Sequence, residues 1–327
     1  MRRATVLLVY YRRASWIQSD VEILQRHYNV LSLVWNSNLD FFRLVALVLR
    51  SDIVLTWFAY GHSLAAVALA RLLRRKCIAV AGGGEVTWIP EIDYGAQGSF
   101  KGRVSTKLCL QTADIVIAVS RHTASELIHV AHPRKLAVVY NAVDVTFFSP
   151  NGERKGAALT VSTGRTRSDL RLKGVDIFLE VAKRLPTFDF FLVGTSRSFL
   201  ARMRYHVPDN VCVLGWVDRP RLRDLYRMCK VYCQLSFYES FGLSLAEAMA
   251  SGCVPVVSDR GALPEVVGDC GYVVPYGDIH AICSTLLLAM RSYHHRSPPV
   301  RRRIVEHFSL DEREKKLLTV IRQLGRC

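Results

Sequence analysis

The sequence lacks features that would place it in several familiar classes of protein. It has no uninterrupted run of the about 18 apolar residues that a membrane-spanning helix needs. The stretch 41–58 comes closest, and Arg43, Arg50 and Asp52 interrupt it. The apolar run behind the first two arginines is short and ends at residues 10–13, so it predicts a first strand and no signal peptide.

Metal-binding patterns are also missing. The nine cysteines contain no C-x-x-C motif, and the closest pair, Cys229 and Cys233, does not match the spacing of zinc ligands. Several cysteines lie in apolar segments, which favours free thiols in a reducing, cytoplasmic compartment. No D-x-D motif occurs, which argues against carboxylates that hold a divalent ion on a diphosphate. We expect neither a metal ion nor a tightly bound cofactor.

Acidic residues are scarce relative to basic ones. The 327 residues contain 44 Lys and Arg against 28 Asp and Glu, a formal charge of +16. The excess is spread over both halves, with small clusters at 71–76 and 301–303. Such a surface suits nucleic acid, an anionic membrane or phosphorylated small molecules, or is simply solvated. No basic stripe with interleaved aromatics is present, so we expect no nucleic-acid partner. The cluster 71–76 beside apolar 65–73 suggests peripheral attachment to the inner face of an anionic membrane.

Strands alternate with amphipathic helices along the chain, which predicts βαβ units on parallel sheets. A turn-rich break at 148–152 separates two such series. We therefore predict two doubly wound, Rossmann-like α/β domains, 1–150 and 151–327, facing across a cleft, with the last helix packing back on the first domain. The expected strands are 5–9, 53–56, 78–80, 115–119, 158–162, 188–193, 211–214, 231–235 and 254–258; the expected helices are 20–27, 63–73, 121–129, 175–184, 245–250 and 310–324.

The segment 238–250, YESFGLSLAEAMA, carries the strongest chemical signal. It follows an expected strand and opens a helix, whose first amides attract phosphate or sugar oxygens. Glu239 precedes that helix and Glu247 lies about one turn inside it, where each carboxylate can accept hydrogen bonds from vicinal hydroxyls. The alternative needs no ligand, because Ser244 and Glu247 also fit a capping box and Glu239 fits an exposed loop acid.

A basic loop follows the expected strand 158–162. Gly164 and Arg165 come directly after it, and Lys173 follows eight residues later. Two cations at the carboxyl end of a strand can neutralise a diphosphate. The alternative is a solvated basic loop, since Arg167 and Arg171 lie there too.

These motifs, followed by SGCVPVV, GALPEVV and GYVVPYGD, resemble the retaining glycosyltransferases of family 4, whose hallmark is E-x7-E. The resemblance implies a GT-B fold and metal-independent transfer of a sugar from a nucleotide donor of the UDP or GDP type. It also implies that Glu247 binds the ribose, that Glu239 holds the transferred sugar, and that Arg165 and Lys173 stabilise the departing nucleotide. The further donor-site residues that it implies are Ser240, Phe241, Gly242, Leu243, Gly164, Gly194 and Val217.

The first half departs from the family pattern. Many relatives place a His after the strand that ends near residue 81, whereas this chain has Gly83, Gly84 and Glu85 there. We consider these three residues, with His62 as a substitute, for the acceptor side. A lone His is more often structural, and that interpretation is preferred for His62.

The implied function is a glycosyltransferase that acts on a hydroxyl acceptor, free or lipid-linked, in polysaccharide or glycolipid synthesis. Two alternatives share the donor half. One is an inactive GT-B scaffold, and the other is an enzyme that moves sugar to phosphate or isomerises a nucleotide sugar.

Overall fold

The computed structural model describes residues 3–325, which form two compact α/β units. The first unit contains residues 3–141 and 313–325, and the second contains residues 142–312. The division falls after Asn141, ahead of the predicted boundary at residue 150. The end of the last helix groups with the first unit.

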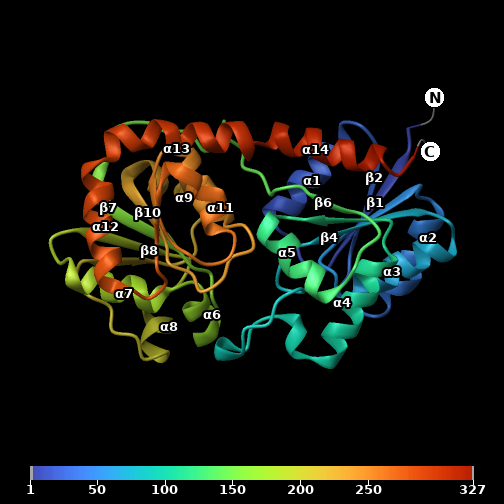
Figure 1. Ribbon diagram of the computed structural model, residues 1–327, viewed down its shortest axis with the longest axis horizontal. Coiled ribbons are helices and arrows are strands. Elements are labelled where there is room, and N and C mark those ends of the chain that lie inside the picture. The colour runs from blue at the N-terminus through green and yellow to red at the C-terminus, as the bar shows by residue number, and fades with distance from the viewer. Residues whose placement is uncertain (1–2, 326–327) are drawn as a thin grey trace. The chain divides into compact units, whose positions relative to one another are not determined.

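The first unit is built on six parallel strands in the order β2-β1-β3-β4-β5-β6 (Figure 1). Strands β1 and β3 are buried along their whole length because helices cover both faces of the sheet, as parallel sheets require. The strands are β1 Thr5–Tyr10, β2 Asn29–Val34, β3 Ile53–Trp57, β4 Lys76–Ala81, β5 Ile115–Ala118 and β6 Leu136–Val138.

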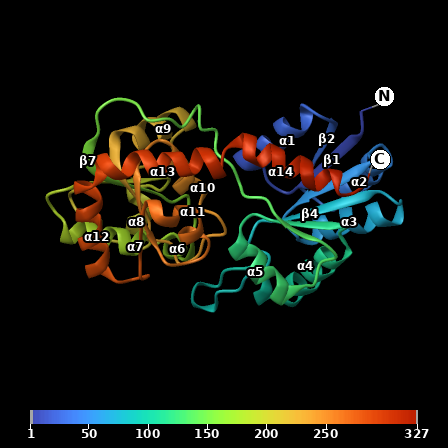
Figure 2. The ribbon, with the colours of Figure 1, turned by 45° about the horizontal axis from the view of Figure 1, so that its top comes forward.

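Helices α2, α3, α4 and α5 pack side by side in that order, and right-handed crossovers place them on one face of this sheet. Helix α14, Leu310–Arg322, belongs to this unit from Arg313 onward and lies beside α1 (Figure 2). The helices are α1 Ser15–Gln25, α2 Asp40–Leu49, α3 Gly61–Leu72, α4 Phe100–Thr112 and α5 Arg121–Val130, with short turns η1 Pro90–Ile92 and η2 Ala96–Gly98 before α4.

A buried ion pair attaches α14 to α1. Arg313 donates through Nε and Nη2 to the two carboxylate oxygens of Asp20, at 2.5 and 2.8 Å, and both side chains are almost fully buried. Trp57 donates its indole N–H to Asp20 at 2.9 Å. Arg313 also donates to the carbonyls of Val139 and Tyr140. Because every charge here has partners, the pair determines where the end of the chain docks.

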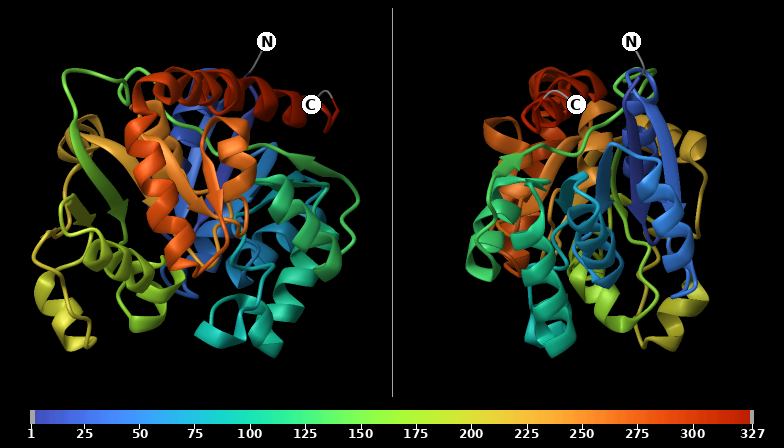
Figure 3. Two further views of the ribbon diagram at one scale, coloured as in Figure 1. Left: turned by 60° about the vertical axis from the view of Figure 1, so that its left-hand side comes forward. Right: turned by 90° about the vertical axis from the view of Figure 1, so that its right-hand side faces the viewer.

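The second unit has six parallel strands in the order β12-β11-β10-β7-β8-β9, seen from two further sides in Figure 3. The strands are β7 Lys155–Val161, β8 Asp189–Val193, β9 Val211–Leu214, β10 Cys229–Gln234, β11 Val254–Ser258 and β12 Tyr272–Val274. The helices are α6 Arg167–Leu172, α7 Val175–Arg184, α8 Arg197–Arg202, α9 Arg219–Met228, α10 Leu243–Ala250, α11 Leu263–Val267, α12 Ile279–Arg291 and α13 Tyr293–His307, with the turn η3 Gly268–Cys270.

Both basic clusters of the sequence are largely engaged within the protein. Arg71 pairs with Asp114 at 2.7 Å, and Arg75 donates to the carbonyl of Leu49. Arg301 donates to the carbonyls of Phe148 and Val145, and Arg303 to those of Val266 and Glu265. Much of the apolar stretch beside the first cluster is buried in α3. Arg71, Leu72, Arg74 and Lys76 are nevertheless exposed, so membrane attachment through the cluster 71–76 stays a prediction.

Candidate functional site

The candidate site lies at the carboxyl edge of the second sheet. Strand β7 has β10 on one side and β8 on the other, so the connections diverge from the boundary between β7 and β10. Open α/β sheets bind ligands at such a switch point, beyond the carboxyl ends of the strands. The loop after β7 carries Gly164 and Arg165, and the loop after β10 carries Glu239. The sequence signals thus converge where the topology predicts a ligand.

Helix α10 begins directly after the Glu239 loop. Its N-terminal cap is Gly242, which has a φ of +87° and no side chain to satisfy the first amides. Ser244 lies inside the helix, so the capping-box alternative of Ser244 with Glu247 is wrong. The first amides of α10, including those of Leu243 and Ser244, have no partners within the helix and can serve an anionic or hydroxyl ligand.

Glu239 is held by a second loop at the same edge. Its backbone carbonyl accepts a hydrogen bond from the amide of Ala262 at 2.8 Å. Gly261, with a φ of +59°, lies so close that a Cβ there would come 2.2 Å from the same carbonyl oxygen. The loop after β11 therefore braces the Glu239 loop, and only glycine fits at the contact.

The Glu239 carboxylate faces a cation from another loop. Lys173 Nζ lies 2.5 Å from Glu239 Oε1, which also accepts from Gln234 Nε2 at 3.1 Å and Ser236 Oγ at 3.3 Å. All three donors meet the same oxygen. Oε2 receives no hydrogen bond from residues 3–325, which leaves one face of the carboxylate for a ligand hydroxyl. The side chain is mostly shielded, with 11% of its surface exposed.

A close backbone approach positions Lys173. The residue ends α6 and precedes Gly174, which has a φ of +66°. A Cβ on Gly174 would lie 1.9 Å from the carbonyl oxygen of Leu235, and the amide of Phe237 donates to the carbonyl of Leu172 at 2.8 Å. The turn after α6 is thus pressed against the segment that follows β10, which brings Lys173 to Glu239.

Arg165 lies in a loop with an ordered backbone and an exposed side chain. Its amide donates to Asp169 Oδ2 at 2.8 Å, and Thr166 and Asp169 form a capping box at the start of α6. Gly164 packs against Asp169, where a Cβ would lie 2.7 Å from the Asp169 Cβ. Within residues 3–325 the guanidinium makes no ion pair, so its charge is available to a ligand.

Glu247 is buried within α10, with 8% of its surface exposed. Burial raises the pKa of its carboxyl to about 7, against the opposing influence of the Arg219 guanidinium and the Tyr226 hydroxyl. A carboxyl that titrates near neutral pH is a common feature of functional sites, although structural carboxyls show it too.

The remaining donor-side candidates occupy the same edge. Gly194 ends β8 with a φ of +96°, and a Cβ there would lie 2.6 Å from the carbonyl oxygen of Ser162, beyond the end of β7. Val217 follows β9 and is half-buried beside Trp216, which is 80% exposed. Ser240 and Phe241 precede the Gly242 cap, and Phe241 is buried with its ring centroid 5.6 Å from that of Phe308.

In the first unit, the structure places two acceptor-side candidates in the interior. Glu85 has no exposed surface, and its Oε1 accepts from the amides of Gly82 at 2.8 Å and Ala59 at 3.1 Å. Burial raises the pKa of this carboxyl. His62 is buried with Nε2 3.0 Å from the Trp57 carbonyl oxygen, and burial lowers its pKa. Both side chains support the backbone around them. For His62 this agrees with the preferred interpretation of a structural histidine.

Sequence reasoning missed an aromatic group near the Gly83-Gly84 loop. The Arg12 guanidinium lies over the rings of Phe58, Tyr11 and Trp16, at 5.0, 5.6 and 5.6 Å from their centroids. A Cβ on Gly84 would lie 3.1 and 3.4 Å from the hydroxyls of Tyr94 and Tyr60. Tyr11, Phe58 and Tyr60 each follow a strand, which is the signal that sequence alone offered.

Two family models match consecutive parts of the chain. A model described as Glycosyltransferase Family 4 matches residues 6–147, and one described as Glycosyl transferases group 1 matches residues 158–292. Each half of the chain therefore matches a glycosyltransferase model. The chain belongs to glycosyltransferase family 4.

The chain is also similar to individual named enzymes. It is 32% identical over 211 residues to the MMP alpha-(1->4)-mannosyltransferase of Mycolicibacterium hassiacum, covering 59% of this chain and 50% of the relative. It is 27% identical over 262 residues to the N-acetyl-alpha-D-glucosaminyl L-malate synthase of Bacillus anthracis, covering 73% and 65%. The alignments thus span less than two thirds of either relative.

The solved structures show the fold. Anabaena HepE, in a structure titled as a complex with UDP and glucose, superposes with a TM-score of 0.78 at 14% sequence identity. The superposition covers 98% of this chain and 100% of that chain. The predicted GT-B architecture of two parallel-sheet α/β domains is confirmed.

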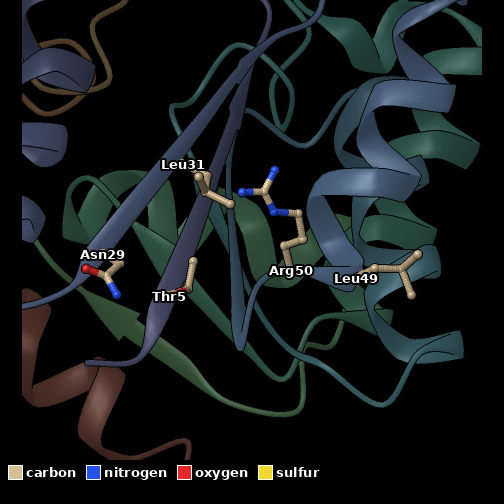
Figure 4. Close-up of a pocket in the computed structure, with 5 residues that line it drawn as sticks. All are labelled: Thr5, Asn29, Leu31, Leu49 and Arg50. Atoms are coloured by element: carbon tan, nitrogen blue, oxygen red, sulfur yellow. The ribbon is translucent and has the colours of Figure 1, made fainter. Parts of the chain in front are cut away.

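One pocket lies away from these loops. It has a volume of about 460 Å³ and is lined by Thr5, Asn29, Leu31, Leu49 and Arg50 (Figure 4). Because Thr5 and Asn29 open β1 and β2, the pocket is at the amino edge of the first sheet, opposite the edge where open α/β sheets bind ligands. Among residues 3–325, no three His, Cys, Asp or Glu side chains gather as metal ligands, and no helix combines the length and apolar character that a bilayer crossing requires.

Proposed function

We propose that this chain transfers a sugar from a nucleoside-diphosphate donor to a hydroxyl acceptor, with retention of the anomeric configuration and without a metal ion. The observation that carries the proposal is the pairing of Lys173 with Glu239 at the switch point of the second sheet, next to the uncapped start of α10. The names of the family 4 relatives and the UDP-containing structure of HepE support it.

In this proposal Glu247 binds the ribose hydroxyls, and Glu239 accepts a hydroxyl hydrogen bond from the transferred sugar through Oε2. Arg165, Lys173 and the first amides of α10 supply positive charge for the diphosphate, the role that a metal ion plays elsewhere. The bond between the anomeric carbon and the β-phosphate oxygen breaks, and the bond to the acceptor oxygen forms on the same face. The acceptor proton passes to the departing phosphate, so no protein nucleophile is required.

The donor nucleotide is proposed to be UDP or GDP, and the acceptor a polysaccharide or lipid-linked hydroxyl. The enzyme would act in the cytoplasm, with access to the inner face of the membrane. Gly83 and Gly84 stay our candidates for acceptor contact, since they precede the buried Glu85 at the carboxyl edge of the first sheet.

Calorimetric titration with UDP, GDP, ADP and nucleotide sugars in EDTA tests the donor site. We expect one nucleotide to bind the wild type and to lose most of its affinity in Glu247→Ala. Glu180→Ala is the matched control, because Glu180 lies in an exposed pair with Arg184 on α7. Absence of binding by any nucleotide in the folded protein would overturn the proposal in favour of the inactive scaffold.

A further inference from the structure

Three large apolar side chains on the helical layer of the first unit are exposed. Phe42 on α2 is 74% exposed, Leu72 at the end of α3 is 79% exposed, and Phe100 on α4 is 74% exposed. These helices lie side by side on one face of the sheet. Single exposed apolar residues are ordinary, whereas several on one face of a helix mark an interaction surface.

Helix α4 is apolar on two sides. Its buried side packs into the core through Thr106, Cys109 and Leu110. Phe100, Val104 and Leu108 follow at intervals of four residues, which places them in one stripe, and all three are exposed. The inner side packs on α3, whereas the side chains of the outer stripe are 40–74% exposed.

The same helix is cationic. Lys101, Arg103 and Lys107 are exposed and flank the stripe, and α4 contains no Asp or Glu. Long basic side chains beside an apolar stripe can lay their stems on hydrocarbon while the charged groups reach lipid phosphates. Two copies of this helix facing each other would oppose like charges, so the composition disfavours a second copy as the occupant.

An aromatic side chain extends the stripe at the N-terminal end of the helix. Trp88 is 39% exposed, and its ring lies so close to Gly98 that a Cβ there would be 2.3 Å away. Gly98 ends the turn η2 just before α4. Tryptophan favours the interface between water and lipid, because its ring is apolar and its N–H is polar.

We propose that α4 docks on an anionic lipid surface. The α4 face consists of Trp88, Phe100, Val104 and Leu108, flanked by Lys101, Arg103 and Lys107. The apolar residues enter the boundary between headgroups and acyl chains, and the cations pair with lipid phosphates. The surface lies on α4, apart in sequence from the cluster 71–76 at the end of α3. Of the three cations on α4, Arg103 also donates to the carbonyl of Gln97 at 3.1 Å.

The α4 face is physically tied to the glycine loop at the carboxyl edge of the sheet. The amide of Ala96 donates to the carbonyl of Gly84 at 2.8 Å, and Gln97 Nε2 donates to the carbonyl of Glu85 at 2.6 Å. Docking would hold this loop near the lipid headgroups. The benefit to a lipid-linked acceptor rests on the proposed function, whereas the docking itself does not.

Flotation with liposomes tests docking without donor or acceptor. A negative result for docking can therefore be told apart from an absence of glycosyl transfer. The wild type is mixed with vesicles of phosphatidylglycerol and phosphatidylcholine in equal parts, and with pure phosphatidylcholine. We expect binding to the anionic vesicles that is at least ten-fold stronger than to the neutral ones and weaker at high salt. Wild type that fails to float with the anionic vesicles at low salt overturns the proposal.

Two double variants on α4, each with a matched double control, locate the surface. Phe100→Ser with Leu108→Ser should lower the apparent affinity at least ten-fold, whereas Leu288→Ser with Val305→Ser, at exposed sites on α12 and α13, should not change it. Lys101→Gln with Lys107→Gln should lower it several-fold more than Lys135→Gln with Lys183→Gln, which removes the same charge elsewhere.

Circular dichroism melting confirms that each variant is folded. Equal losses in an α4 variant and its control overturn the assignment to α4. Sedimentation velocity without lipid tests whether a second copy of the chain occupies the face instead. A wild-type dimer that dissociates in the Phe100→Ser, Leu108→Ser variant would assign the face to that second copy and overturn lipid docking.

Discussion

Lys173 Nζ lies 2.5 Å from Glu239 Oε1, although the two residues are 66 positions apart in the chain. The contact joins the turn after α6 to the loop after β10, the two segments that flank the switch point of the second sheet. A cation held this way fixes one carboxylate oxygen and leaves the other for a ligand.

Glu239→Gln should separate transfer from nucleotide binding. The substitution keeps the shape of the side chain but removes the charge that Lys173 neutralises. We expect kcat to fall by about 100-fold or more, as for loss of other preorganised polar groups. The nucleotide Kd should change by no more than about three-fold. Steady-state kinetics and calorimetry measure both, with Glu180→Gln as the control. A parallel loss of kcat and nucleotide affinity would contradict a role confined to the sugar.

Glu247 should make nucleotide affinity depend on pH. Because burial raises the pKa of this carboxyl to about 7, it is protonated below that pH and cannot accept two hydroxyl hydrogen bonds. We expect affinity to rise between about pH 6 and pH 8 in the wild type and to stay flat in Glu247→Gln. Calorimetry across this range measures it. The same slope in both proteins would assign the titration to another group.

The same carboxyl should influence stability in the opposite direction. The folded protein holds this proton more tightly than the unfolded chain does, since the folded pKa is about 7 and the unfolded pKa is near 4.3. The contribution is therefore fully present below about pH 4 and is lost as the pH rises from there through about 7, by at most roughly 4 kcal/mol. Urea unfolding of the wild type and Glu247→Gln at pH 5 and pH 8 tests this. A stability difference that does not change with pH would count against it.

Gly174→Ala should displace Lys173. The new Cβ would overlap the carbonyl of Leu235. The alanine would also have to adopt a φ of +66°, which L-residues disfavour. We expect a loss of more than about 2 kcal/mol in the free energy of unfolding, with impaired transfer. Gly152→Ala isolates the backbone contribution, because Gly152 has a φ of +72° with nothing within 4 Å. Equal effects of the two substitutions in urea unfolding would show that the Leu235 contact is unimportant.

Arg313→Met should be among the most destabilising changes in the first unit. It leaves the Asp20 charge buried without its partner, which costs about 3–5 kcal/mol in comparable pairs. Arg184→Met removes an exposed pair with Glu180 and should cost less than about 1 kcal/mol. Denaturant unfolding compares them. Hydrogen exchange should also show faster exchange at the end of α14 in Arg313→Met, and unchanged protection there would argue against the docking role of this pair.

The periodicity of the sequence determined most of the buried strands. The predicted strands 53–56, 211–214 and 254–258 correspond closely to β3, β9 and β11, because parallel strands covered on both faces are continuous apolar runs. Strand β2 was missed because its side chains are largely exposed or half-buried, and β12 because it is only three residues long. Helix α13 was missed because it contains Pro298 and Pro299, which ordinarily interrupt a helix.

The sequence by itself determined which residues could form the candidate site, since motif spacing placed Glu239 before a helix and the cations after a strand. Only the tertiary structure decided that Lys173 pairs with Glu239, that Gly242 and not Ser244 caps α10, and that Glu85 points into the interior. The physical reason is that hydrogen bonding and burial depend on which loops the sheet order brings together. That order is a property of contacts distant in sequence, which local spacing does not encode.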